Sequence, residues 1–306
     1  MSRPQRGSRD FCPPRQTSIR IFEDSEKPIF PDDPRYALIL EAAELAHYLL
    51  RTDSGSSRLE EIKQAIQGEG KARPNLPPDY KEVFLKPLSV NAGIVRLAEP
   101  KGGKAEFVPP QSKPGQGQYP PQNLSSEKFG EIRLSKSMLD EMCDGLRDKE
   151  RDSLQYKKEL AYLALLMTRL LFERFINWLT GHPNKPIVTT QSLSSNATLR
   201  MFHGKIKRLK NPPGFEGAYG LWVELKDKTV RRLSDEYIHN LVDPEGPLLT
   251  EKTLPFKVTM EIYPDSGSGP SQPRPKSMAA GGGSGKGGGS SGAGPSKPMQ
   301  KKSTAT

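Results

Sequence analysis

The sequence predicts an α+β fold: an N-terminal helical hairpin and a long central helix packed with a small C-terminal antiparallel β-sheet or barrel, with disordered basic tails. Three observations lead to this prediction. Apolar residues recur at helical spacing up to about residue 180, and short β-branched and aromatic runs separated by turn residues follow. The 28 Gly and 29 Pro of the 306 residues concentrate in segments that cannot pack a core.

Changes in composition along the chain divide it into six segments. They are a basic extended arm (1–32), a helical hairpin plus β-hairpin (33–108), a Pro/Gln/Gly linker (109–127), a helical segment (128–182), a β-rich basic region (183–263) and a Gly/Ser/Pro/Lys tail (264–306).

The arm carries apolar residues expected to dock on the body as short strands or anchors: Ile19, Ile21, Phe22, Ile29 and Phe30. The first helix is predicted over Tyr36–Leu50, with Asp33 as its cap and Pro34 in its first turn. The second is predicted to start at Ser57, because Ser57-x-x-Glu60 has the capping-box pattern, and to stop at Gly68.

The middle of the chain is predicted to hold a short helix over Asp79–Leu85 and a β-hairpin. The strands of that hairpin would be Ile94–Leu97 and Ala105–Val108. Ser137-x-x-Asp140 indicates the start of another helix. Six consecutive charged residues at 147–152 must then be solvated.

The strongest helical pattern runs from Ser153 to Thr180. A narrow polar stripe recurs every four residues at Arg169, Glu173 and Asn177, and the other sides are almost entirely apolar. Such a helix is typical of the centre of a core or of an oligomer interface. Gly181 and Pro183 are expected to end it.

A strand pattern follows, with Lys226-Asp227-Lys228 as a hairpin turn and Asp235–Leu241 as a helical turn. The predicted strands are Pro186–Thr190, Leu199–Leu209, Tyr219–Leu225, Thr229–Leu233 and Lys257–Tyr263.

The net charge of +10 lies almost entirely in the two ends of the chain. Residues 1–20 hold five Arg against one Asp, and residues 264–306 hold six Lys or Arg against one Asp. The 243 residues between them carry 35 basic and 34 acidic side chains. Flexible cationic arms on a near-neutral body favour sequence-independent attraction to a polyanion.

Within the body, residues 200–232 carry nine basic groups against three acidic ones, interleaved with Phe202, His203 and Phe215. Basic side chains on a sheet with exposed aromatic rings are what a platform for single-stranded nucleic acid needs, although the same pattern is also typical of a solvated face over aromatic core residues. The nucleic-acid-binding candidates are Arg200, Lys205, Lys207, Arg208, Lys210, Lys226, Lys228, Arg231, Arg232, Tyr219 and Trp222.

A second pattern, Pro77-Pro78-Asp79-Tyr80, matches the P-P-x-Y peptides that WW-type domains accept. The same residues also read as an ordinary helix start. With the Pro-rich linker, Pro77, Pro78 and Tyr80 are the candidate partner-binding residues.

No pattern predicts an enzyme, a cofactor or a metal site. The four His and two Cys have no ligand spacing, and His239, with Asp235 and Asp243 nearby as possible polarising carboxylates, lacks a nucleophile motif. The N-terminus lacks the apolar region of a secretory signal, and charges interrupt the most apolar stretch. We therefore expect an intracellular protein, cytoplasmic or nuclear, without a membrane span.

These patterns lead to a non-catalytic nucleic-acid-binding protein, with RNA favoured over DNA and a homo-oligomer as a further possibility. In composition and layout, a compact body with basic Gly/Ser/Pro-rich ends, the chain resembles nucleocapsid and RNA-packaging proteins. The alternative is an interaction adaptor or scaffold that uses the P-P-x-Y and Pro-rich segments.

Overall fold

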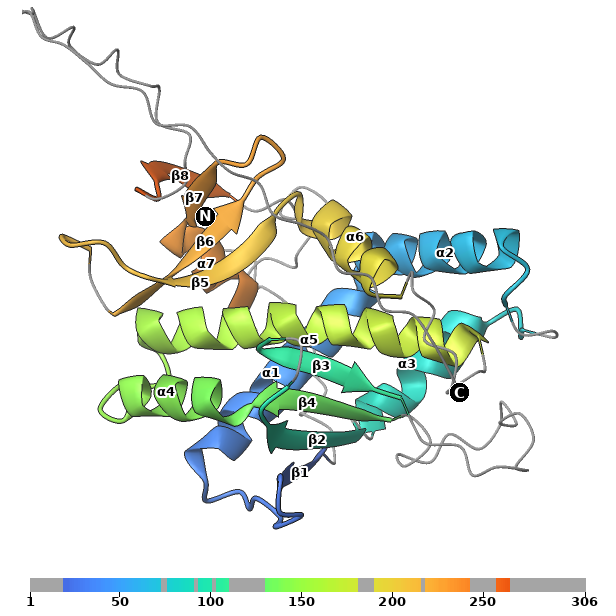
Figure 1. Cartoon of the computed structure of the whole chain (residues 1–306), viewed down its shortest axis with the longest axis horizontal. Coiled ribbons are helices and arrows are strands. Elements are labelled where there is room, and N and C mark those ends of the chain that lie inside the picture. Colours follow the sequence, from blue (N-terminus) through green and yellow to red (C-terminus); the bar gives the residue numbers. More distant parts are fainter. Residues whose placement is uncertain are drawn as a thin grey trace, which may run out of the picture. The chain divides into compact units, whose positions relative to one another are not determined.

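The computed structural model describes residues 19–72, 76–90, 93–100, 103–109, 130–180, 190–215, 218–242 and 257–264 (Figure 1). All of them belong to a unit spanning residues 1–268. They form seven helices and two four-stranded sheets, one mixed and one antiparallel, which confirms the α+β prediction. Most of the predicted basic arm, the linker and the tail lie outside the described residues.

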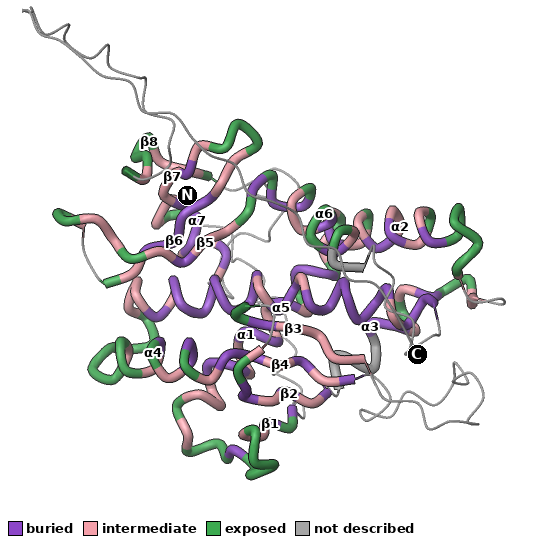
Figure 2. The backbone as a smooth tube through the Cα atoms, in the orientation of Figure 1, coloured by how far each residue is buried: buried purple, intermediate pink, exposed green. Residues whose placement is uncertain are grey.

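Helix α5 (Leu154–Thr180) is the centre of this unit and confirms the predicted long helix. It is buried along almost its whole length (Figure 2). Its polar stripe has internal partners, since Arg169 donates to the Ala105 carbonyl at 3.1 Å and Glu173 accepts from Ser194 at 3.2 Å. The apolar sides of α5 therefore build the core of a single chain.

The helical hairpin consists of α1 (Pro34–Arg51) and α2 (Asp53–Gly68), and Asp33 caps α1 as predicted. The predicted start of α2 at Ser57 is wrong. Thr52 is the cap, and its hydroxyl accepts from the Gly55 N–H at 3.1 Å. Only Thr52 separates α1 from α2. Glycine allows this close connection, because Gly55 lies against the end of α1 and a Cβ there would come within 2.3 Å of the Leu49 carbonyl oxygen.

The first sheet contains β1 (Ile19–Glu23), β2 (Gly93–Ala98), β3 (Ala105–Val108) and β4 (Glu131–Ser135), in the order β1-β2-β4-β3. The predicted hairpin of β2 with β3 is wrong, because β4 lies between them, parallel to β2 and antiparallel to β3. Sequence analysis missed β4, whose alternation buries Ile132 and Leu134.

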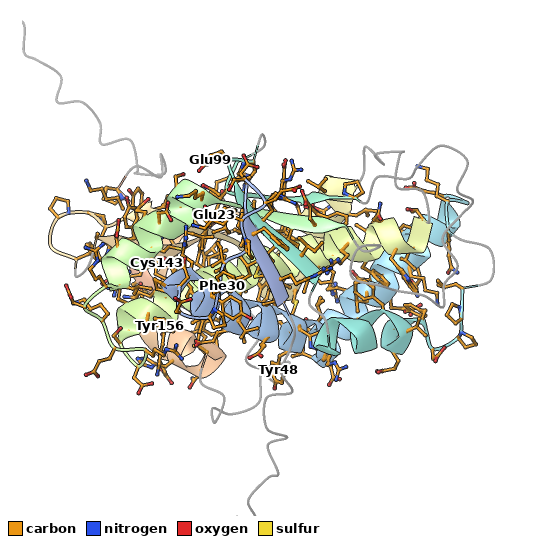
Figure 3. All side chains as sticks on the ribbon, turned by 90° about the horizontal axis from the view of Figure 1, so that it is seen from below. Glu23, Phe30, Tyr48, Glu99, Cys143 and Tyr156 are labelled. Atoms are coloured by element: carbon orange, nitrogen blue, oxygen red, sulfur yellow. The ribbon has the colours of Figure 1, made fainter. Side chains whose placement is uncertain are left out.

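The predicted anchors of the arm divide into two groups. Ile19 and Ile21 are buried in β1, Ile29 is buried beside it, and Phe22 is partly buried. Phe30, labelled in Figure 3, is 61% exposed and is therefore not an anchor.

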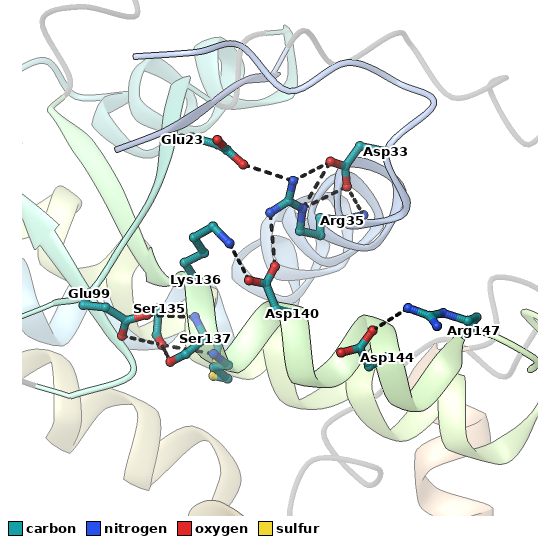
Figure 4. A network of polar contacts seen from close by, with 11 residues as sticks. Glu23, Asp33, Arg35, Glu99, Ser135, Lys136, Ser137, Asp140, Asp144 and Arg147 are labelled. Atoms are coloured by element: carbon teal, nitrogen blue, oxygen red, sulfur yellow. Dashed lines mark hydrogen bonds and ion pairs between the residues drawn. The ribbon is translucent and has the colours of Figure 1, made fainter. Parts of the chain in front are cut away.

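Two further helices differ from the prediction at their ends. Helix α3 (Tyr80–Val90) is longer than expected. Helix α4 (Lys136–Leu146) is capped by Ser135 instead of Ser137, because the Ser135 hydroxyl accepts from the Met138 N–H at 3.2 Å. Figure 4 shows the Glu99 carboxylate accepting from the Ser137 N–H and from the Ser135 hydroxyl. The charged residues 147–152 are exposed, as predicted.

The second sheet is antiparallel, as predicted, and its strands follow the order β5-β6-β7-β8. Its elements and their flanking helices are α6 (Thr190–Phe202), β5 (Lys205–Lys210), β6 (Tyr219–Glu224), β7 (Val230–Leu233), α7 (Asp235–Val242) and β8 (Val258–Ile262). The strand predicted over Leu199–Leu209 is wrong in its first part. Residues 199–202 end α6, and His203 then takes φ +57° before β5 begins. The strand predicted over Pro186–Thr190 falls outside the described residues, except for Thr190 at the start of α6.

One contact between α1 and α3 predicts a pH dependence of folding. The Nε2 atom of His47 lies 3.0 Å from the Leu85 carbonyl, and burial lowers the pKa of His47 below its usual 6.5. Between the folded pKa of His47 and its usual pKa of 6.5, the folded chain therefore binds fewer protons than the unfolded chain. The free energy of unfolding should then fall as the pH drops from about 7 through the folded pKa.

Urea midpoints at pH 7.5 and 5.5 test this dependence in the wild type and in His47→Gln. The variant keeps an N–H donor for Leu85 but does not titrate, so its midpoint should fall less on acidification. An equal fall in both proteins would contradict the assignment.

Candidate nucleic-acid interface

Strand β5 divides the basic candidates between its two faces. Alternation places Lys205 and Lys207 on one face and Arg208 and Lys210 on the other. Lys207 lies opposite Trp222, and Lys205 lies opposite Glu224. The two faces of β5 have different surroundings, so its basic side chains differ in their exposure to solvent.

Arg208 belongs to a buried ion network instead of an accessible surface. Its Nε and Nη2 atoms donate to both carboxylate oxygens of Glu159 at 2.7 and 3.0 Å, and both side chains are only 4% exposed. Its Nη1 atom donates to Glu141 at 3.1 Å, and its guanidinium lies 3.8 Å from the centre of the Tyr219 ring. Burial lowers the pKa of Arg208, but its hydrogen bonds to Glu159 and Glu141, together with the charges of these two carboxylates, outweigh burial and raise the pKa. Arg208 and Tyr219 therefore join β5 and β6 to α4 and α5.

Trp222 has no exposed ring face. It is fully buried and packs edge-on against Phe215 at 5.8 Å and Tyr263 at 5.0 Å between ring centres. Phe202 is also fully buried. Trp222 and Phe202 therefore offer no ring face for stacking, whereas Phe215 and Tyr219 are partly buried.

The remaining arginine candidates contact other side chains. Arg200 pairs with Glu61 at 3.2 Å. Arg232 pairs with Asp235 at 3.0 Å and with Glu261 at 3.2 Å. Arg231 lies 3.7 Å from the sulfur of Met260. Phosphate would have to compete with these contacts.

The lysines form a more open group at one end of the sheet, which we call the lysine cluster: Lys205, Lys207, Lys226 and Lys228. Lys205 and Lys226 are exposed and make no ion pair with a described residue. Lys207 and Lys228 pair with Glu224 at 2.8 and 3.4 Å. Lys210 is exposed at the opposite end of β5. The lysine cluster is thus the part of 200–232 where several cations meet solvent, two of them paired with Glu224.

The P-P-x-Y tyrosine is part of the core. Tyr80 is 4% exposed, its ring stacks on Phe175 at 6.1 Å, and its hydroxyl donates to Glu60. Pro77 is partly buried and Pro78 is exposed. These contacts support the helix-start interpretation, since the Tyr80 ring has no free face for a WW-type groove.

The residues with the greatest potential for chemistry are held by structural contacts. The Nδ1 atom of His239 lies 3.2 Å from the Lys157 ammonium, where a general base would need a carboxylate. Burial raises the pKa of the Cys143 thiol to about 11. Within the described ranges, no group of three or more His, Cys, Asp or Glu side chains is arranged to hold a metal ion. No described helix is long and apolar enough to cross a membrane.

Sequence reasoning missed the role of Arg174, a buried cation on α5. It donates to the Gly130 carbonyl at 3.2 Å, just before β4, and burial lowers its pKa to about 10. Gly93, at the start of β2, has φ +94°, and a Cβ there would lie 2.4 Å from the Arg174 Nη2 atom. The available signal was an arginine that falls outside the polar stripe of α5. Its contacts at the starts of two parallel strands are structural.

Comparison with family models, curated proteins and solved structures finds no match for this chain. The candidate interface therefore depends on the contacts of its own residues, and among them the lysine cluster has the most accessible charge.

Proposed function

We propose that this protein is a non-catalytic nucleic-acid-binding protein, with RNA favoured over DNA, that contacts phosphates through its cationic ends and its lysine cluster. The observation that carries the proposal is the lysine cluster: two of its lysines pair with Glu224, and the other two are exposed and have no ion-pair partner among the described residues. The +4 and +5 net charges of residues 1–20 and 264–306 add long-range attraction.

The chemistry of these side chains defines the mode of binding. A lysine ammonium is a compact charge with three rotatable donors, which suits phosphate oxygens in many orientations. Because Trp222 is buried, its ring does not stack on bases. We therefore expect recognition of the phosphate backbone, strong dependence on salt and little preference for base sequence.

Salt-titrated binding of single-stranded RNA, single-stranded DNA and duplex DNA tests the proposal with the full-length chain. Replacing all four cluster lysines by Gln should flatten the log–log salt slope by about 0.7–0.9 for each phosphate that the variant no longer neutralises. Gln is shorter than Lys but remains polar and capable of hydrogen bonding without the charge, so circular dichroism should remain unchanged.

A matched control replaces Lys27, Lys71, Arg147 and Lys149 by Gln. This set also removes four charges, two paired with Glu69 and Asp144 and two exposed without an ion pair to a described residue. It should change the slope less than the cluster variant. Equal effects of the two variants would mean that net charge, and not the lysine cluster, determines binding. Absence of wild-type binding at low salt would reject the proposal.

A further inference from the structure

Glu224 pairs with two lysines of the lysine cluster. It is the last residue of β6 and lies directly opposite Lys205 in the pairing register. Its two carboxylate oxygens bind lysines from different elements: Oε2 lies 2.8 Å from Lys207 on β5, and Oε1 lies 3.4 Å from Lys228 in the β6–β7 turn. One carboxylate thus holds two cations that sequence reasoning counted as available.

The other acidic residue of this region is committed to the turn. The Oδ1 atom of Asp227 accepts from the Thr229 N–H at 2.9 Å and from the Thr229 hydroxyl at 2.7 Å. Glu224 is therefore the carboxylate that forms ion pairs with lysines of the cluster, namely Lys207 and Lys228. The hydrogen bond from Lys207 holds the pKa of Glu224 below its usual value, so the carboxylate stays ionised at neutral pH.

A phosphate group presents to lysine the same chemistry as this carboxylate, namely anionic oxygens that accept charge-assisted hydrogen bonds. Lys207 and Lys228 are 34% and 82% exposed, so a phosphate can approach both ammonium groups from solvent. Glu224 is only 20% exposed and is attached to the strand, so it remains beside them.

We infer that Glu224 is a built-in competitor for phosphate: it neutralises Lys207 and Lys228 in the free protein and weakens binding of the nucleic-acid backbone at the lysine cluster. This inference rests on the proposed function. It makes Glu224 a residue that tunes affinity, with opposite effects on the fold and on binding. Removing its charge should destabilise the free protein, because the lysines then repel one another, and should strengthen phosphate binding.

The test compares Glu224→Gln with the wild-type full-length chain, using a single-stranded RNA oligonucleotide. We expect affinity at low salt to rise on the order of tenfold. The log–log salt slope should steepen by about 0.7–0.9 for each lysine released. The urea midpoint of the free variant should fall at low salt and recover at high salt, where repulsion is screened.

Glu69→Gln is the matched control, because it adds the same charge and frees Lys71 from an exposed ion pair of 2.6 Å at the end of α2. It should raise affinity less than Glu224→Gln. If the wild type binds and Glu224→Gln binds equally, more weakly or no better than Glu69→Gln, the inference is wrong while the proposed function stands. If the wild type and both variants fail to bind, the proposed function itself fails.

Discussion

Replacing Gly55 by alanine should destabilise the fold by about 2–3 kcal/mol, although alanine is the better helix former. Gly55 lies in the first turn of α2, where a Cβ would stand 2.3 Å from the Leu49 carbonyl oxygen and 2.8 Å from the Leu50 Cα. Both atoms belong to the backbone of α1, so they cannot move aside as a side-chain end would. The steric cost therefore exceeds the gain of about 0.5–1 kcal/mol in helix propensity.

Urea unfolding of Gly55→Ala checks this prediction, with Gly145→Ala as the control. Gly145 is also helical, in the last turn of α4, but a Cβ there would meet no atom within 4 Å. The control should gain about 0.5–1 kcal/mol, so the two substitutions should have opposite signs. A stabilised Gly55→Ala would mean that the α1–α2 connection is looser than described.

Replacing Arg208 by methionine should cost about 3–5 kcal/mol, because it leaves the Glu159 carboxylate buried without its cation. The two side chains are each 4% exposed and are joined by two hydrogen bonds. The loss of the Glu141 ion pair should add less to this cost, since Glu141 is 46% exposed and water can replace Arg208 as its hydrogen-bond donor. Thermal and urea unfolding of the single variant measure this cost.

The double variant Arg208→Met, Glu159→Leu tests the reason for the loss. Removing both charges should restore most of the stability, since a well-packed apolar pair often equals a buried ion pair. Lys136→Met, which breaks an exposed pair with Asp140, should cost less than about 1 kcal/mol. If the double variant is as unstable as the single one, the loss comes from packing instead of an unpaired charge.

Local signals in the sequence predicted much of the secondary structure. Asp33 and Pro34 start α1 because a cap acts within one helical turn. The apolar pattern of α5 is visible because 27 residues repeat it. The Ser57 pattern failed because Thr52 competes as a cap only once Gly55 allows α2 to touch α1, a tertiary contact.

Pairing between distant segments was not predictable in the same way. β2 and β3 are close in sequence, yet β4 from beyond the linker separates them. The candidate site shows the same limit. Counting charges put Arg208 and Lys205 in one basic segment as equal candidates. Only the fold shows that Glu159 and Glu141 bind Arg208, whereas Lys205 is exposed. Tyr80 and Trp222 are buried for the same reason, since partners from other elements cover them.

The late position of α5 in the chain has a consequence for biosynthesis. The apolar face of α1, with Leu38, Ile39 and Leu49, is covered by a helix that ends at Thr180. At synthesis rates of about 5–20 residues per second, the ribosome exposes α1 on the order of 10 s before its partner emerges. During that interval the apolar face of α1 in the nascent chain lacks the helix that covers it in the folded protein.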